Sequence, residues 1–150
     1  MPDQMLMISP HFSYIEMTAT QVRGYDNKPT PQALLNLGSV CSVMELVRLL
    51  FGSPINVHSG YRSPDVNRVV GGVANSAHKF GLACDFDIGT WGSNRDVWNR
   101  LKAKVPEWGI DQLILEYDNW VHIGLAGPGL TDGNGTPVTS PRHMIFTIGC

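Results

Sequence analysis

The chain has 150 residues, of which 43% are hydrophobic and 16% charged, and its formal net charge is -2 at pH 7. This length is typical of one domain that can bury a core without disulfide bonds. The charge excludes a strongly basic surface of the kind that binds a phosphate backbone, so we expect no nucleic-acid partner.

The sequence lacks the signals of a membrane-spanning protein and of a protein with a signal peptide. No run approaches the roughly 20 apolar residues of a membrane span, and the first residues lack the pattern of a signal peptide. The cysteines Cys41, Cys84 and Cys150 form no CxxC pair. They therefore predict neither a disulfide framework nor a thiolate zinc site.

The chain begins with an expected arm, residues 1–29, that carries one short helix packed on the domain. Thr30 and Pro31 then predict the start of a long helix, because threonine caps helices and proline loses no hydrogen bond at the first helical position. Apolar residues recur at three- and four-residue steps from Leu34 to Phe51, and Gly52 ends the run. We expect this to be the main core helix.

Short elements follow. Residues 55–59 alternate like a half-buried strand, and Ser63 with Pro64 predicts a short helix to about Val70. From Leu82 to Ile88, alternation places apolar side chains on one face of a strand and two carboxylates on the other.

The second half predicts one more helix and a hairpin. The helix covers residues 94–105 and ends at Pro106. Residues 113–116 and 120–125 form two strands around a tight turn, with His122 opposite the buried face. After a loop over residues 127–140, residues 144–148 form a final edge strand. The order of elements predicts one α+β domain, residues 1–150, with a small antiparallel sheet packed with helices.

A histidine and an aspartate, His78 and Asp85, stand seven positions apart with Gly81 between them to allow a tight turn. Such a pair alone is more often a surface hydrogen bond than a metal site. Hydrolytic zinc sites take three nitrogen or oxygen ligands and leave a fourth position open. His122, on the polar face of a strand, is the best candidate for a third ligand.

Several motifs in a fixed order carry a resemblance to a known family. They are Ser59-Gly60-Tyr61-Arg62-Ser63-Pro64, Asn67-Arg68, Gly71-Gly72, Ser76-x-His78-x-x-Gly81-x-Ala83-x-Asp85 and Trp120-Val121-His122. Together they resemble the zinc D-Ala-D-Ala carboxypeptidase family, which shares its fold with L-alanyl-D-glutamate endopeptidases and the hedgehog signalling domain. The similarity extends from Ser9 to His122 and fades after about Gly127.

The resemblance implies a hedgehog-like fold and one Zn²⁺ per chain, held by His78, Asp85 and His122. It also implies that Arg62 lies in the cleft and that an acidic residue just before His122 is the general base. A zinc-bound water would attack a peptide bond of the peptidoglycan stem while this carboxylate accepts its proton. Carboxypeptidase and endopeptidase action both remain open.

Two carboxylates, Glu116 and Asp118, compete for the role of base, because Asn119 stands where related enzymes commonly have an acid. A three-residue turn would pair Glu116 with Trp120 and place Glu116 on the face of His122. A two-residue turn would turn Glu116 away. We favour Glu116, with Asp118 as the competitor.

Three other residues are candidates for substrate binding, each with a structural alternative. Arg62 could hold a carboxylate or bond loop carbonyls, Ser76 could bind substrate or cap its loop, and Trp120 could line the cleft or cover the sheet. Asp87 is expected to be a surface carboxylate. The remaining histidines, His11, His58 and His143, are expected to be packed or solvent-facing.

The sequence therefore predicts a monomeric zinc metallopeptidase that degrades the bacterial cell wall. The alternative is a non-catalytic cell-wall-binding or virion structural module that keeps the fold, and a hydrolase for another small amide is a further rival. A thiol enzyme using Cys84 is disfavoured because alternation buries that residue. The lack of a readable export signal favours a phage-encoded, endolysin-like or virion-associated enzyme over a bacterial protein exported by another route.

Overall fold

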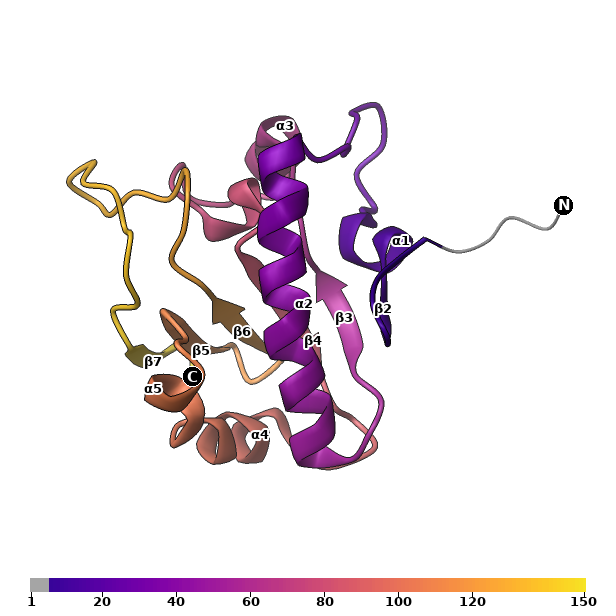
Figure 1. The fold of residues 1–150 in the computed structure, drawn as a ribbon, viewed down its shortest axis with the longest axis vertical. Helices are drawn as coiled ribbons and strands as arrows, with labels where there is room; N and C mark the ends of the chain where they lie inside the picture. The colour runs from indigo at the N-terminus through magenta and orange to yellow at the C-terminus, as the bar shows by residue number, and fades with distance from the viewer. Residues whose placement is uncertain (1–5) are drawn as a thin grey trace, which may run out of the picture.

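A five-stranded sheet organises the structure, a computed structural model that describes residues 6–150 (Figure 1). Across the sheet the strands are β3 (Asn56–Ser59), β4 (Ala83–Asp87), β6 (Trp120–Gly124), β5 (Gln112–Glu116) and β7 (Met144–Ile148). The helices are α1 (Tyr14–Thr18), α2 (Pro31–Phe51), α3 (Pro64–Val69), α4 (Asn94–Leu101), α5 (Lys104–Glu107) and a 3₁₀ helix, η1 (Ala77–Phe80). The predicted α+β class is confirmed.

The main sheet is mixed, which corrects the expectation of a wholly antiparallel one. The final strand β7 lies at the sheet edge, as predicted, but runs parallel to β5. Because β5 and β6 form an antiparallel hairpin, the C-terminal end of β6 lies next to the N-terminal end of β5. The loop that follows passes to the far side of β5 and so enters β7 in the direction of β5.

The N-terminal arm contains a small hairpin as well as the expected short helix. Strands β1 (Met7–Ser9) and β2 (Phe12–Ser13) pair with each other ahead of α1. Strands this short leave too little alternation to be recognised in the sequence.

The long helix α2 begins and ends where the sequence predicts. The Thr30 side chain accepts a hydrogen bond from the Ala33 amide, and Gly52, with φ 61°, donates its amide to the Arg48 carbonyl. Its length and composition would also allow it to cross a membrane, but 44% of its most apolar window is buried inside the domain. We therefore interpret α2 as a core helix. Leu34, predicted to face the core, is 38% exposed.

The predicted helix over residues 94–105 is broken in two, which corrects its expected boundary. α4 ends at Leu101, and Pro106 lies inside the separate helix α5. Proline at position 106 cannot donate to the carbonyl of Lys102, and its ring collides with that carbonyl in a continuous helix. It is tolerated in the first turn of α5, where amides need no partner within the helix.

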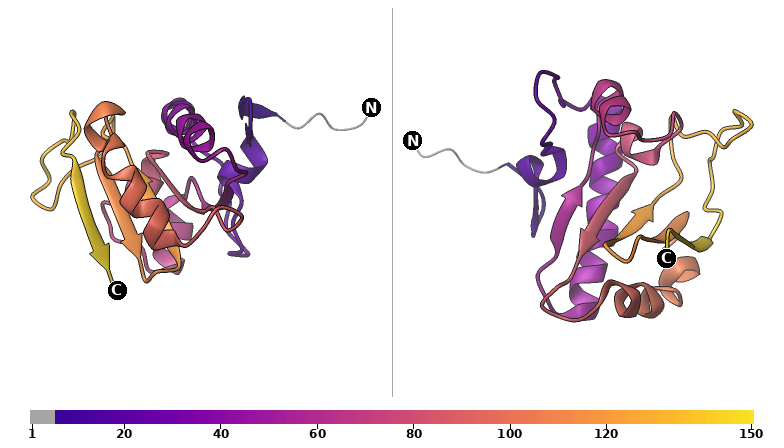
Figure 2. Two further views of the ribbon diagram at one scale, coloured as in Figure 1. Left: turned by 90° about the horizontal axis from the view of Figure 1, so that it is seen from below. Right: turned by 180° about the vertical axis from the view of Figure 1, so that it is seen from behind.

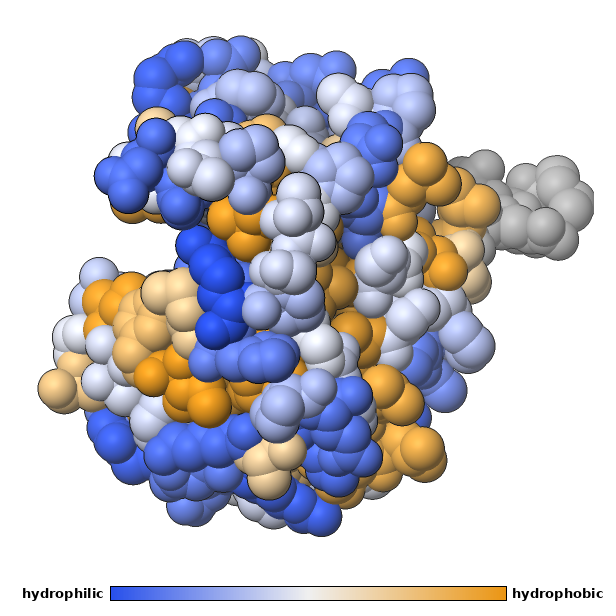
Figure 3. Space-filling model, turned by 60° about the vertical axis from the view of Figure 1, so that its left-hand side comes forward, coloured by the Kyte–Doolittle hydropathy of each residue, from blue (hydrophilic) through white to orange (hydrophobic). Residues whose placement is uncertain are grey.

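The sheet has one buried face and one open face. Apolar side chains of β4, β5 and β6 point into the core with α2 and α4; they include Cys84, Phe86, Leu113, Leu115, Val121 and Ile123. Seen from behind, β3 and β4 lie in front of α2 (Figure 2). Exposed apolar side chains form several separate patches on the surface, and one edge of the molecule is deeply indented (Figure 3). The alternation predicted for β4 is confirmed, and its polar face points away from α2.

Candidate metal centre

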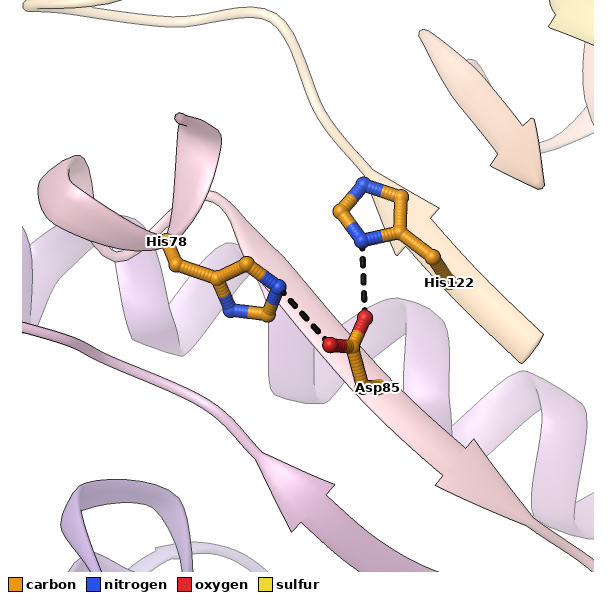
Figure 4. A group of neighbouring side chains, drawn as sticks. All are labelled: His78, Asp85 and His122. Carbon is orange, nitrogen blue, oxygen red and sulfur yellow. Dashed lines mark hydrogen bonds and ion pairs between the residues drawn. The ribbon is translucent and has the colours of Figure 1, made fainter. Parts of the chain in front are cut away.

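Three buried side chains meet on the open face of the sheet (Figure 4). His78 comes from η1, Asp85 from β4 and His122 from β6, and one ligand atom from each lies within 4.8 Å of the others. Asp85 and His122 are direct partners in the antiparallel ladder between β4 and β6. The structure thus brings together the three residues that the sequence selected.

Local sequence signals place His78 at this point. The Ser76 side chain caps η1 by accepting the His78 amide at 3.3 Å. Gly81 ends η1 with φ 70°, and a Cβ there would overlap the backbone of Ala33, 3.0 Å from its carbonyl carbon. A glycine is therefore required for the turn from η1 into β4, as predicted.

A backbone carbonyl orients the His78 ring. His78 Nδ1 lies 2.7 Å from the carbonyl oxygen of Gly60 and donates to it in the neutral ring. The lone pair is then on Nε2, which is buried, has no hydrogen-bond partner among the described residues and lies 3.1 Å from Asp85 Oδ2 (Figure 4). Metal-binding histidines are commonly oriented by such a bond from their second nitrogen.

Charge interactions within the cluster shift two pKa values. Burial alone would raise the pKa of Asp85, but the positive charge of His78, when that ring is protonated, and the hydrogen bond from His122 outweigh it and hold that pKa well below its usual range. Burial opposes the charged form of His122, but the hydrogen bond and charge of Asp85, helped by Glu116, raise its pKa. His122 Nδ1 lies 2.8 Å from Asp85 Oδ1.

The donor set fits a zinc ion. Two imidazoles and a carboxylate are the three nitrogen and oxygen ligands typical of hydrolytic zinc sites. Nε2 of His78 and Nε2 of His122 are both buried without a hydrogen-bond partner in the described structure, and His78 Nε2 faces Asp85 Oδ2 at 3.1 Å. Such groups are costly to leave unpaired, and a metal ion bound by the cluster would give the His78 nitrogen a partner.

A hairpin places Glu116 beside the cluster. Glu116 pairs with Trp120, so the three-residue turn predicted between β5 and β6 is confirmed. Glu116 Oε1 lies 3.8 Å from His122 Nδ1, and its Oε2 accepts a hydrogen bond of 2.9 Å from Trp120 Nε1. Glu116 therefore shares the face of His122.

Asp118 lies at the tip of the same turn, with φ 53°. Its carboxylate is 3.2 Å from Arg95, and its side chain is 52% exposed. The structure therefore brings Glu116, and not Asp118, to the metal cluster.

Arg62 approaches the cluster from the loop that precedes α3. Its Nη1 donates to Asn67 Oδ1 at 3.2 Å, and its Nη2 lies 3.7 Å from Asp85 Oδ2. Burial lowers its pKa, although the charges of Asp85 and Glu116 oppose that shift. Its Nε is buried without a partner in the described structure. The guanidinium is thus held next to the cluster with a donor to spare.

The cluster lies where two parts of a cleft meet. One part, of about 500 Å³, is lined by Ser76, His78, Glu116 and His122, with residues of β7 and the loop before it. The wider part, of about 860 Å³, is lined by residues 19–23, by β3 and by α3. Arg62, Val70, Asp85 and Trp120 line both parts.

His58, expected to be packed or solvent-facing, and Asp87, expected to be a surface carboxylate, lie together beside the cleft. His58 lines the wider part of the cleft, and its Nε2 forms a short ion pair with Asp87. Alternation places His58 on the same face of β3 as Asn56, but no motif in the sequence singles it out. His11 instead pairs with Glu45, 2.7 Å away.

The cysteines do not contribute to the site. Cys41 and Cys84 are buried free thiols, as expected. Burial raises the pKa of Cys41 to about 12 and raises that of Cys84 strongly. Neither thiol would ionise at neutral pH, which excludes the thiol-enzyme alternative for these residues.

Comparison with known proteins agrees with this geometry. The sequence profile of a family described as peptidase M15 matches residues 10–124. A search of curated proteins found no match.

Proposed function

The chain belongs to the peptidase M15 family, the zinc D-Ala-D-Ala carboxypeptidase-like family, and from this premise we propose that it hydrolyses peptide bonds in bacterial peptidoglycan stems. The observation that carries the proposal is the buried cluster of His78, Asp85 and His122, with Glu116 next to it, at the junction of an open cleft. Family membership supports a metallopeptidase, and the peptidoglycan substrate and the cell wall as site of action are our inference.

We assign the metal to the imidazoles of His78 and His122 and to the carboxylate of Asp85. When bound, Zn²⁺ supplies Lewis-acid chemistry, polarising a carbonyl and lowering the pKa of a water molecule towards neutrality. The Gly60 carbonyl keeps the proton of His78 on Nδ1 and so leaves Nε2 free for the ion.

Glu116 is the proposed proton carrier. Trp120 Nε1 holds its Oε2, and this fixes the carboxylate with Oε1 towards His122. A carboxylate so placed can accept a proton from the attacking water and pass it to the leaving amine. Typical contributions of such a base are about 10²–10⁴-fold in rate.

Arg62 is the proposed electrostatic partner of the substrate. Its guanidinium is mostly buried and its Nε has no partner in the described structure. A preorganised donor in a site with little water can hold a substrate carboxylate or the developing oxyanion. Trp120, which lines both parts of the cleft, would pack against the peptide.

Metal content and hydrolysis measured on the same samples test the proposal. Wild type, His78→Ala, His122→Ala and the control His11→Ala, which changes an exposed histidine outside the cleft, are assayed by mass spectrometry for zinc and with purified peptidoglycan. We expect one zinc per chain and hydrolysis in wild type and control, and loss of both in the two site variants. Stoichiometric zinc without hydrolysis would instead favour the binding-module alternative, and folded wild type without metal would overturn the assignment.

A further inference from the structure

We propose that the C-terminal strand β7 is a positioning element for Glu116, acting through a contact between Gly149 and the ring of Tyr117. This inference rests on the proposed function, in which Glu116 carries the proton. It gives a role to a part of the chain that the family profile does not cover, because the profile ends at residue 124 and β7 lies beyond it. The point of contact is the turn that follows Glu116.

The turn between β5 and β6 has an unfavourable backbone conformation. Tyr117 and Asp118 directly follow Glu116, and both have positive φ, 56° and 53°. Asparagine and glycine are the usual residues in this conformation, and it is unfavourable for a bulky aromatic residue. Residues in such conformations persist where the surrounding structure holds them, and they are frequent at active sites. The contacts of Tyr117 and Asp118 therefore show what holds the turn.

The N-terminal end of α4 holds one side of the turn. Asn94 Nδ2 donates to the Asp118 carbonyl oxygen at 3.1 Å, and the Asp118 carboxylate lies 3.2 Å from Arg95 Nη2. Both charged side chains are about half exposed. Water and salt screen exposed ion pairs of this kind, so they contribute little stability. This side alone leaves the turn weakly held.

The strand β7 holds the other side of the turn. It runs along β5 at the edge of the sheet (Figure 2), with Ile148 in register with Glu116. The Tyr117 amide donates to the Ile148 carbonyl oxygen at 2.7 Å, so the ladder between the two strands continues into the turn. This bond fixes the backbone of Tyr117 from the neighbouring strand.

Gly149, the residue after β7, holds the side chain of Tyr117. Its φ is 66°, a conformation that glycine adopts without the steric cost of a Cβ. A Cβ at this position would also overlap the edge of the Tyr117 ring. The ring therefore lies against the backbone of Gly149, with no room for a side chain between them.

The Tyr117 ring also lies next to Trp120, which binds the Glu116 carboxylate. The ring centroids of Tyr117 and Trp120 are 5.9 Å apart, a distance typical of favourable aromatic pairs. Trp120 Nε1 donates to Glu116 Oε2 at 2.9 Å, while Glu116 Oε1 lies 3.8 Å from His122 Nδ1. A continuous series of contacts thus leads from Gly149 through Tyr117 and Trp120 to the carboxylate.

Displacement of Glu116 should lower the rate and leave metal binding intact. A general base must lie within hydrogen-bond reach of the proton it accepts, and a misplacement of about 1 Å can cost about 10²-fold in rate. The candidate ligands His78, Asp85 and His122 belong to η1, β4 and β6, which β7 does not adjoin in the sheet. A change at Gly149 should therefore affect kcat and not zinc content.

Gly149→Ala tests the contact, and Gly135→Ala is its matched control. Both glycines have positive φ, 66° and 79°, so alanine meets similar backbone strain at either position, but a Cβ at Gly135 has no atom within 4 Å. The zinc-loaded proteins are assayed with a soluble peptidoglycan stem peptide. We expect Gly149→Ala to lower kcat by about 10–100-fold at nearly unchanged KM and zinc content, and Gly135→Ala to match wild type.

An NMR spectrum of the metal-free protein tests the link without turnover. The indole N–H of Trp120 donates to Glu116, so its signal, identified by its loss in Trp120→Phe, reports that hydrogen bond. We expect Gly149→Ala to shift this signal and Gly135→Ala to leave it in place. An unshifted signal in Gly149→Ala would overturn the proposal.

Tyr117→Ala shows whether the effect passes through the ring. This variant lacks the ring atoms that a Cβ at Gly149 would meet. In this background Gly149→Ala should therefore cause no further loss of kcat, the non-additivity expected of residues in contact. An undiminished loss would overturn the route through Tyr117.

The same assays separate failure of this inference from failure of the proposed function. Hydrolysis by wild type, with equal kcat in Gly149→Ala, would overturn the role of β7 and leave Glu116 as the proposed base. Zinc-loaded wild type without hydrolysis would overturn the proposed function and, with it, the role of β7.

Discussion

Gly60 links the fold to the metal centre, and replacing it with alanine tests that link. Its carbonyl orients His78, and its Cα faces the backbone of Met17. A Cβ at this position would overlap the Met17 carbonyl oxygen and lie 3.0 Å from its carbonyl carbon. Because the obstacle is backbone and not a flexible side chain, the strand or α1 must move.

The expected cost of Gly60→Ala follows from this overlap. Forcing an extra carbon into a packed site typically costs about 1–3 kcal/mol. In a domain of this size that corresponds to a melting temperature lower by about 2–12 °C. Displacement of the carbonyl that orients His78 should also weaken zinc binding, by about 10–100-fold on the scale known for such orienting groups.

Thermal unfolding without metal and zinc titration against a chromophoric chelator measure the two effects separately. Gly38→Ala in α2 is the matched control, because a Cβ there meets no atom within 4 Å. We expect it to raise stability by roughly 0.5–1 kcal/mol, the gain of alanine over glycine inside a helix, with unchanged zinc affinity. Wild-type stability and zinc affinity in Gly60→Ala would refute the reasoning.

Three further predictions concern carboxylates. Glu116→Gln should lower kcat by about 10²–10⁴-fold with zinc content unchanged, while Asp118→Asn, at the exposed tip of the turn, should stay near wild type in the same assay. The metal-free protein should be most stable between about pH 4 and 6.5 in urea titrations. The pKa of Asp85 is depressed from 3.8, so Asp85 stabilises the fold above pH 3.8 and loses this effect as pH falls. The pKa of His122 is raised from 6.5, so His122 stabilises the fold below pH 6.5 and loses this effect as pH rises. A flat profile would contradict this assignment. Asp111→Asn should lower the free energy of unfolding by roughly 2–3 kcal/mol in urea titrations. The substitution removes a buried carboxylate that accepts three hydrogen bonds from Arg142.

The parts of the fold that the sequence predicts are those set by neighbouring residues. Thr30, Pro31 and Gly52 fix the ends of α2 through local hydrogen bonds and backbone conformation. The alternation of β4 follows from its two faces, one in the core and one carrying Asp85. The turn length places Glu116, because pairing with Trp120 determines its face.

The parts that the sequence does not predict depend on distant contacts. The direction of β7 is set by a loop that passes to the far side of β5, and loop composition carries no such information. The break after Leu101 follows from Pro106 acting on a carbonyl four residues earlier, which a periodic pattern does not show. The register shift between Val57 and Ser59, which makes Ser59 the ladder partner of Asp85, leaves no mark in the sequence pattern.

The division between predictable and unpredictable residues has a functional counterpart. β4 and β6 each direct apolar side chains into the core from one face and a side chain of the candidate metal site from the other, and a slip of one residue would exchange the two faces. The geometry of Asp85 and His122 is therefore held by the same packing that holds the fold. Arg23 and Arg62, which also line the cleft, lie in loops and outside this constraint. Substitutions in these loops can change the lining of the cleft while the candidate metal site stays intact, so under the proposed function substrate preference would diverge faster than the chemistry.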